Sequence, residues 1–187
     1  MLNPHGRGVA NAIRAGVEAA SAPWVLVGVC DDPGWIVAAD EMMALAEGGC
    51  DLVNATRYAH GGLRFAGSRV GWILSRLANW LFQRFAGCVL TDPTTGIKLF
   101  RRTDFASFGL DPVSAGWASA FEMSIKAQMR GMKLGETPIV SVDRMFGGTS
   151  TFRPGAWIVA YLRWFVWGVI QLRRAGRRQP AVIRRGS

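Results

Sequence analysis

The sequence is poor in the residues that build a disulfide-bonded or metal-bound scaffold. Its three cysteines, Cys30, Cys50 and Cys88, stand far apart and show no metal-type spacing. An odd number of isolated thiols argues against a disulfide framework and indicates a reducing compartment, so we expect these side chains to be small core residues. The two histidines, His5 and His60, lie next to glycines without partners at metal-ligand spacing, so we expect neither to be a ligand.

Common catalytic signatures are also absent. The chain has no Ser/His/Asp order, no Walker phosphate loop and no GxGxxG fingerprint. Met1 leads into the polar, glycine-containing stretch "LNPHGRG", which does not resemble a signal peptide. The evidence for function therefore lies in the charge balance, the spacing of apolar residues and less common motifs.

Acidic residues are scarce relative to basic ones. The chain has 13 aspartates and glutamates against 22 lysines and arginines, which gives a formal net charge of +9. Such a balance calls for an acidic partner: nucleic acid, anionic lipid or a phosphorylated substrate. After Leu172 the chain reads "RRAGRRQPAVIRRGS", which is either a solvated disordered tail or an anchor to anionic lipid on the cytoplasmic side. Nucleic acid is the weakest of these partners, because the arginines flank a tryptophan-rich apolar segment and do not line an aromatic-dotted groove.

Half of the 187 residues are hydrophobic, which is enough for one domain with a real core. Apolar residues at helical spacing predict helices in "GRGVANAIRAGVEAAS", "WIVAADEMMALAEGG", "SRVGWILSRLANWLFQRFAG" and "AFEMSIKAQMRGM". Continuous or β-branched apolar runs predict strands in "PWVLVGVC", "CDLVNATRY", Ile97 to Phe100 and "KLGETPIVSVDR". This alternation predicts an α/β fold with a mostly parallel sheet, whose ligands gather at the carboxyl ends of the strands.

The last apolar segment, Ala156 to Leu172, lies at the short end of what can span a bilayer and has Arg163 in its middle. It contains aromatic residues of the kind that prefer the lipid headgroup level: Trp157, Tyr161, Trp164 and Trp167. An amphipathic helix lying in the membrane interface fits this pattern better than a spanning helix, and a core helix of a soluble domain is the remaining alternative. We therefore divide the chain into a domain at 1–153, a juxtamembrane helix at 154–172 and a basic, disordered tail at 173–187.

Four acidic residues are candidates for chemistry. Asp31 and Asp32 follow a predicted buried strand, where two carboxylates can bind Mg²⁺ or Mn²⁺, although an aspartate before a proline is also a common helix cap, and the pair alone favours the cap. Asp92 lies in the turn "TDPTTG", which needs no function of its own. Glu122 lies inside an apolar helix, where a carboxylate is costly unless it is paired or partly exposed.

Taken together, several segments resemble family 2 glycosyltransferases of the dolichol-phosphate mannose synthase branch. "NPHGRGVANAIRAGVEAA" is similar to the N-x-G-x-G-x-A-x-x-x-G helix, "DLVNATRY" to the D-x-V-x-G-S-R-Y strand, and "SRLANWL" to the S-R-x-x-N helix of that branch. "TDPTTGIKLFRR", "FEMSIKAQMRGMKLGETPI" and "DRMFGGTSTF" resemble three further motifs in the same order. The order of these motifs, over about residues 3 to 170, is more specific than any one of them.

The resemblance implies a GT-A fold, a nucleotide-sugar donor such as a UDP- or GDP-hexose, a divalent metal and a polyprenyl-phosphate acceptor. It implies that Asp92 and Glu122 are acids near the active site. It further implies that Arg57 contacts donor or acceptor phosphate, and that Ser75, Arg144 and Ser150 serve the acceptor phosphate, the last two from a loop. The metal would fall to Asp31 and Asp32.

The chain departs from the family pattern at its start. The family's P-x-Y/F-N-E strand and D-x-S-x-D segment, which bind the nucleotide, have no counterpart, so we expect an incomplete sheet and weak donor binding. The metal motif is shortened to "VCDDPG", and Thr151 follows Ser150 where the family has a basic residue. We expect a hexosyltransferase-like protein at the cytoplasmic face of a membrane. The alternative is a non-catalytic membrane-surface protein that keeps the same fold.

Overall fold

The computed structural model describes residues 3–65, 69–112, 114, 116–142, 154–176 and 181–183. Its α-helices are α1 (Val9–Ala19), α2 (Gly34–Glu47), α3 (Arg69–Ala86), α4 (Phe105–Phe108), α5 (Ala118–Met129) and α6 (Pro154–Ala175), with a short 3₁₀ turn at Arg102–Asp104. Its strands are β1 (Trp24–Val27), β2 (Leu52–Thr56), β3 (Leu63–Phe65), β4 (Lys98–Arg101), β5 (Leu134–Pro138), β6 (Val140–Val142) and β7 (Val182–Ile183). The α/β alternation expected from the sequence is confirmed.

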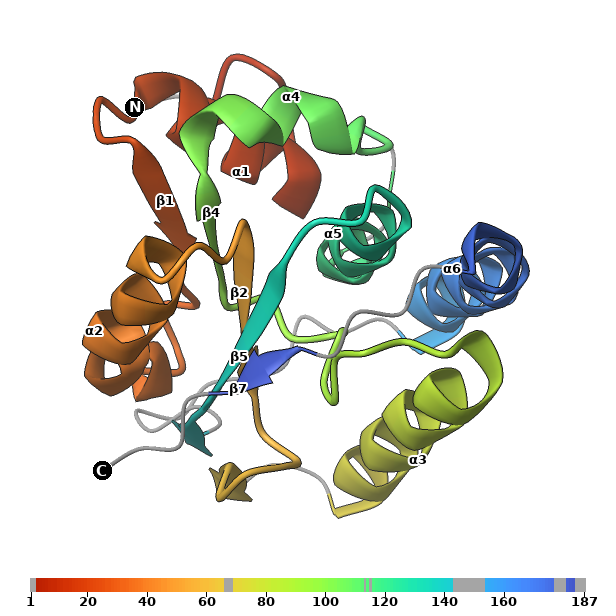
Figure 1. Cartoon of the computed structure of the whole chain (residues 1–187). Coiled ribbons are helices and arrows are strands. Elements are labelled where there is room, and N and C mark those ends of the chain that lie inside the picture. Colours follow the sequence, from red (N-terminus) through yellow and green to blue (C-terminus); the bar gives the residue numbers. More distant parts are fainter. Residues whose placement is uncertain are drawn as a thin grey trace.

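The central sheet has the order β1-β4-β2-β5-β7, and β3 pairs with β6 in a small second sheet (Figure 1). The pairs β2–β5 and β5–β7 are parallel, whereas β4 runs antiparallel to both β1 and β2. The sheet is therefore partly parallel, not mostly parallel as the sequence suggested. The reason is the position of the turn that contains Asp92. This turn lies at the carboxyl end of β2, so β4, which follows it, runs in the direction opposite to β2.

Helices cover both faces of this sheet. On one face, α2 packs against alternate strand residues such as Val53 and Leu99. On the other face, Leu52 and Phe100 join a larger core built with α1, α3, α5 and α6. Figure 1 shows α2 on its own side of the sheet and α1 and α5 on the opposite side. This alternation along each strand is what a sheet covered on both faces requires.

Helix α6 has a packed side and an exposed side. Trp164 is buried and donates a hydrogen bond to Ser114 Oγ at 3.2 Å, and Phe165 lies 5.2 Å from the ring of Phe82 in α3. The expectation that Trp164 lies at the lipid headgroup level is therefore wrong. A Cβ on Gly168 would come within 2.7 Å of Phe82, so this glycine lets the two helices approach closely.

The described helices include none that combines the length and the apolar character needed to cross a membrane. Within the segment expected to be a disordered tail, Val182 and Ile183 pair in parallel with Gly135 and Glu136 of β5. Of the three thiols, Cys50 and Cys88 are buried as expected, whereas Cys30 is exposed.

Candidate functional site

The carboxyl end of β2 meets the Asp92 turn in a bidentate ion pair. Arg57 Nε lies 2.7 Å from Asp92 Oδ2, and Arg57 Nη2 lies 2.9 Å from Asp92 Oδ1. The backbone N–H of Arg57 and the hydroxyl of Thr94 also donate to this carboxylate, at 3.2 and 3.1 Å. Asp92 is fully buried, while the side chain of Arg57 remains 17% exposed. The aspartate therefore fixes the guanidinium in one orientation at the protein surface.

A second acid, Glu136 of β5, binds the backbone of the turn that contains Asp92. Its Oε1 accepts hydrogen bonds from the backbone N–H groups of Thr91 at 2.8 Å and Asp92 at 3.3 Å. It also accepts from Asn54 Nδ2 at 3.4 Å, and the same amide donates to the carbonyl of Asp92 at 3.0 Å. Because β2 and β5 are parallel neighbours with Asn54 opposite Glu136, the sheet places both side chains under the turn.

Lys98, the first residue of β4, is buried in the same place. Its Nζ donates to Asn54 Oδ1, to Ser124 Oγ at 2.7 Å and to the carbonyl of Pro93 at 3.3 Å. An ammonium with three protein acceptors is fully satisfied, so Lys98 fixes the position of the turn and of α5. We call the set formed by Asn54, Arg57, Asp92, Lys98 and Glu136 the Asp92 network.

Helix α3 closes one side of the network with polar groups. Tyr58 donates its hydroxyl to Ser75 Oγ at 2.9 Å, and Asn79 Nδ2 donates to Thr94 Oγ1 at 3.0 Å. The guanidinium of Arg57 also lies 5.0 Å from the centre of the Tyr58 ring. Ser75, Tyr58 and Thr94 are half-buried, and the hydroxyl of Thr94 lies 3.5 Å from Arg57 Nη2.

Burial shifts the pKa values of the network in a consistent way. It would lower the pKa of Arg57, but the charge and hydrogen bonds of Asp92 outweigh it and raise that pKa. Burial lowers the pKa of Lys98 to about 7, against the opposing effect of Asp92. Burial also raises the pKa of Glu136 to about 7, against its hydrogen bonds from Thr91. Around neutral pH, the network therefore contains one fixed ion pair and two groups close to titration.

The structure brings together three of the site residues implied by the resemblance: Arg57, Ser75 and Asp92. Glu122 lies elsewhere, in α5, where it pairs with Lys126 at 2.6 Å and accepts from the backbone N–H of Asp111 at 2.9 Å. These contacts attach α5 to the loop at 109–111, so Glu122 has a structural role in this arrangement. Arg144 and Ser150 lie outside the described residues.

The two aspartates proposed for a metal do not form a ligand set. Asp32 accepts from the backbone N–H groups of Gly34 at 3.0 Å and Val142 at 3.2 Å through Oδ1, and from Ser141 Oγ through Oδ2. Both oxygens are thus engaged in holding the start of α2 to β6, although Asp32 lies one residue before Pro33, the N-cap of this helix. Asp31 is exposed, and the described residues contain no group of three acidic, histidine or cysteine side chains able to hold a metal. We derive no catalytic step through a metal at this position.

Sequence reasoning missed Lys98, Glu136 and Asn54. The signal was present, because each is a polar residue within an apolar strand run, in "GIKLF", "LGETPI" and "DLVNAT". A charged side chain in such a run is costly unless it is paired, so these positions indicate a buried network.

No protein-family model matches the chain, whereas solved structures do. Glucosyl-3-phosphoglycerate synthase from Mycobacterium tuberculosis in complex with UDP is 18% identical, with a TM-score of 0.52, and the match covers 94% of this chain and 58% of that chain. The same synthase in complex with Mn²⁺, UDP-glucose and phosphoglyceric acid is 19% identical, with a TM-score of 0.53, over 94% of this chain and 57% of that one. A further mycobacterial protein is 16% identical, with a TM-score of 0.52, over 93% and 53%.

These similarities define the class of fold. The chain has the α/β GT-A fold of nucleotide-sugar glycosyltransferases, as the resemblance implied. It spans about 58% of the length of the synthase it matches.

Proposed function

We propose that this chain is a glycosyltransferase-like protein that transfers a hexose from a nucleotide sugar to a polyprenyl phosphate at the cytoplasmic face of a membrane. The observation that carries the proposal is the guanidinium of Arg57, which is fixed by Asp92 and lies 3.5 Å from the hydroxyl of Thr94 and 5.0 Å from the centre of the Tyr58 ring. A fixed and partly exposed guanidinium suits a phosphate group.

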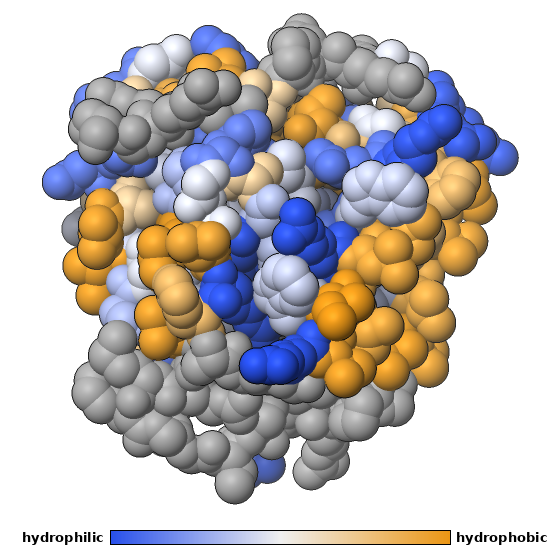
Figure 2. Space-filling view, turned by 90° about the horizontal axis from the view of Figure 1, so that it is seen from below, coloured by the Kyte–Doolittle hydropathy of each residue, from blue (hydrophilic) through white to orange (hydrophobic). Residues whose placement is uncertain are grey.

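The surface next to this guanidinium suits a lipid. Helix α3 contributes Ser75 and Asn79 to the site, and its other side exposes large apolar residues: Val70, Ile73, Leu74, Leu77, Trp80 and Phe85. Helix α6, which packs against α3, exposes Ile158, Val159, Leu162, Val166 and Ile170. Figure 2 shows apolar residues gathered on one side of a hydrophilic centre, on the side where α3 lies in Figure 1. An exposed apolar area of this kind marks an interaction surface.

The chemistry requires little from the protein beyond positioning. An oxygen of the acceptor phosphate forms a bond to C1 of the sugar, while the bond from C1 to the donor phosphate oxygen breaks and the nucleoside diphosphate leaves with the electron pair. The phosphate is already anionic, so this step needs no proton acceptor. Asp92 is fully buried and occupied by Arg57, and we therefore assign it a positioning role. The expected result is inversion at C1.

The structural neighbours support a nucleotide sugar as the donor. Those enzymes were solved with UDP, UDP-glucose, Mn²⁺ or Mg²⁺, and this chain matches little more than half of their length. We infer that the chain by itself binds nucleotide sugars and their divalent metal weakly. Calorimetric titration with UDP- and GDP-sugars in the presence of Mn²⁺ measures this, and micromolar affinity would contradict it.

The transfer reaction is tested with the whole chain on liposomes that contain polyprenyl phosphate. Labelled UDP- or GDP-hexose is added with Mg²⁺ or Mn²⁺, and label in the lipid phase is counted. We expect wild-type label to exceed that of Arg57→Met at least tenfold, while Arg130→Met, on the exposed end of α5, retains it. Equal labelling by wild type and Arg57→Met would contradict the assigned role of Arg57.

A second candidate is a non-catalytic membrane-surface protein with the same fold. The observation in its favour is that both carboxylate oxygens of Asp32, the half-buried member of the metal pair, are engaged in holding the start of α2 to β6. Flotation with anionic and neutral liposomes separates the two functions. Binding to lipid without any transfer in the labelled-sugar assay would support the second candidate.

A further inference from the structure

One buried titratable pair close to Arg57 has no part in the transfer chemistry described above. His60 Nε2 lies 3.9 Å from Oε2 of Glu136, and the two side chains are 21% and 1% exposed. Both atoms are buried, and neither has a hydrogen-bond partner among the described residues. Oε1 of the same carboxyl group accepts from Thr91 and Asp92, so Oε2 is the oxygen left for His60. Two buried polar atoms this close together become complementary once a proton lies between them.

The backbone holds His60 in an uncommon conformation. Among the described non-glycine residues, His60 alone has a positive φ, at 59°, and Gly61 follows it with a φ of 96°. A residue stays in this region when the surrounding contacts determine its position, and histidine tolerates it better than most residues do. His60 belongs to the segment 57–62, which joins β2 to β3 and which we call the Arg57 loop. The ring of His60 therefore connects this loop to β5 through Glu136.

The Arg57 loop and Glu136 also meet at the Asp92 turn. The backbone N–H of Arg57 donates to Oδ2 of Asp92 at 3.2 Å, and the backbone N–H of Asp92 donates to Oε1 of Glu136 at 3.3 Å. The turn thus fixes the first residue of the loop, and the same carboxyl group that binds the turn lies next to the ring of His60. A movement of His60 away from Glu136 would therefore affect the loop that positions the guanidinium.

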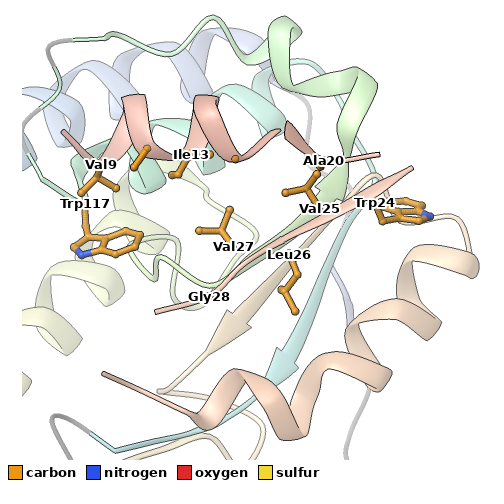
Figure 3. A pocket seen from close by; sticks show the side chains of 11 residues that line it. Val9, Ile13, Ala20, Trp24, Val25, Leu26, Val27, Gly28 and Trp117 are labelled. Carbon is orange, nitrogen blue, oxygen red and sulfur yellow. The ribbon is translucent and has the colours of Figure 1, made fainter. Parts of the chain in front are cut away.

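The groove between β1 and α1 offers no comparable group (Figure 3). It has a volume of about 540 Å³, with Trp117 at one end, and none of the residues that line it has a charged or titratable side chain. Its walls therefore keep their charge when the pH changes, whereas the surroundings of Glu136 do not.

We propose that His60 is a positioning residue of the phosphate site, an inference that rests on the function proposed above. His60 and Glu136 share one proton, and this proton holds the Arg57 loop closed against β5. Loss of the proton leaves a buried, charged carboxylate next to a neutral ring, so the loop opens and lets water reach the carboxylate. The guanidinium of Arg57 is then less well fixed, and the site binds phosphate more weakly as the pH rises.

The direction of this effect follows from Glu136. Burial raises the pKa of its carboxyl group from 4.5 to about 7. Opening of the loop brings water to the carboxyl group and returns its pKa towards 4.5, so opening releases a proton when the pH lies between these two values. Opening therefore becomes more favourable as the pH rises from about 5 to about 7.

The other titratable groups around this carboxyl group act differently. Arg57 and Asp92 neutralise each other in their ion pair. Burial raises the pKa of Cys88 to about 12, well above this range. Burial lowers the pKa of Lys98 from 10.5 to about 7, so any exposure of its ammonium would take up a proton, and only above about pH 7. The range from about pH 5 to 7 therefore reports on the shared proton.

Hydrogen exchange of the backbone amides in the Arg57 loop, in the whole chain, measures the opening. After correction for the intrinsic exchange rate at each pH, we expect wild-type opening to increase by about fivefold or more between pH 5 and 7. His60→Asn keeps a residue that tolerates a positive φ and should exchange fast at both pH values. Glu136→Gln should exchange slowly at both, because its amide donates to the ring as the protonated carboxyl group does.

The chain offers a matched control in its other histidine. His5 pairs with the exposed Glu18 at 2.6 Å, so His5→Asn makes the same chemical change away from the Arg57 loop. This variant should show the wild-type pH profile. A wild-type loop whose opening does not change with pH would overturn the proposal, and so would a pH response that survives in Glu136→Gln.

Sulfate is the second probe, because its charge does not change in this pH range. In calorimetric titration of the whole chain, its dissociation constant should rise at least threefold from pH 5 to 7 in wild type. It should stay constant in Glu136→Gln, and Arg57→Met should show no such rise. A loop that responds to pH without any change in sulfate binding would support the contact of His60 with Glu136 and contradict the phosphate role of Arg57, so the two failures can be distinguished.

Discussion

Two buried ion pairs in this chain resemble each other in burial and differ in their surroundings. The acids Asp92 and Glu122 are both fully buried, and their partners Arg57 and Lys126 are exposed to a similar extent, 17% and 16%. Asp92 lies in a turn where β2, β4, β5 and α3 contribute polar groups, whereas Glu122 links one turn of α5 to a single loop. Burial alone therefore does not identify a functional acid, and the number of elements that converge on it is more informative.

The largest effect is expected when the first pair is broken. Asp92→Ala leaves Arg57 without its counter-charge and removes the acceptor for Thr94, so the free energy of unfolding should fall by about 3–5 kcal/mol. Urea denaturation of wild type and variant measures this difference. A loss below about 1 kcal/mol would mean that Asp92 does not fix the guanidinium.

The stability of the chain as a function of pH separates the two ion pairs further. Among the described residues, only the Asp92 network has two groups whose pKa values are shifted to about 7. Glu136 has its pKa raised from 4.5, so its contribution to stability is present below pH 4.5 and is lost as the pH rises through 7. Lys98 has its pKa lowered from 10.5, so its contribution is present above pH 10.5 and is lost as the pH falls through 7. Stability should therefore pass through a minimum near neutral pH, with a depth on the order of 1–3 kcal/mol.

Two variants test which residue causes the fall in stability below pH 7 and which causes the rise above it. In urea unfolding at pH values of about 5, 7 and 9, Glu136→Gln should remove the fall between 5 and 7. Lys98→Met should remove the rise between 7 and 9. A wild-type profile that is flat across this range would contradict the shifted pKa values.

The smallest effect is expected at the second pair. Glu122→Gln keeps an acceptor for the N–H of Asp111 and leaves the ammonium of Lys126 near the surface, so the loss should be about 1 kcal/mol. Burial raises the pKa of Glu122, which also reduces the cost of a neutral side chain there. In the liposome assay this variant should behave like wild type; a loss of transfer would restore Glu122 as a catalytic candidate.

Much of the fold could be predicted from local patterns. Helical spacing predicted α1, α2, α3 and α5, and runs of apolar residues predicted β1, β2, β4 and β5. The direction of β4 could not be predicted, because it depends on how the Asp92 turn enters the sheet. The burial of Trp164 could not be predicted either, since a tryptophan-rich helix has the same composition whether it faces lipid or Phe82 and Phe121.

Part of the candidate site could be predicted from the order of the family motifs along the chain. Arg57, Ser75 and Asp92 come from three separate segments, and the family pattern indicated all three. Glu122 was grouped with them, but a one-dimensional motif does not reveal that its side chain contacts the backbone of Asp111. Lys98 and Glu136 needed a physical argument about charge in apolar strands, which the sequence would have supported.

Helix α5 has a consequence for how the molecule opens. All of its residues from Ala118 to Ile125 are buried, with α6 packed on one side and β4 reached through Ser124 and Lys98. Its amides can reach water only when the surrounding helices detach, whereas those near the exposed side of α6 need no such event. The slowest-exchanging amides should thus belong to α5, and they would report the global unfolding of the chain, while α6 would report partial opening events at lower free energy.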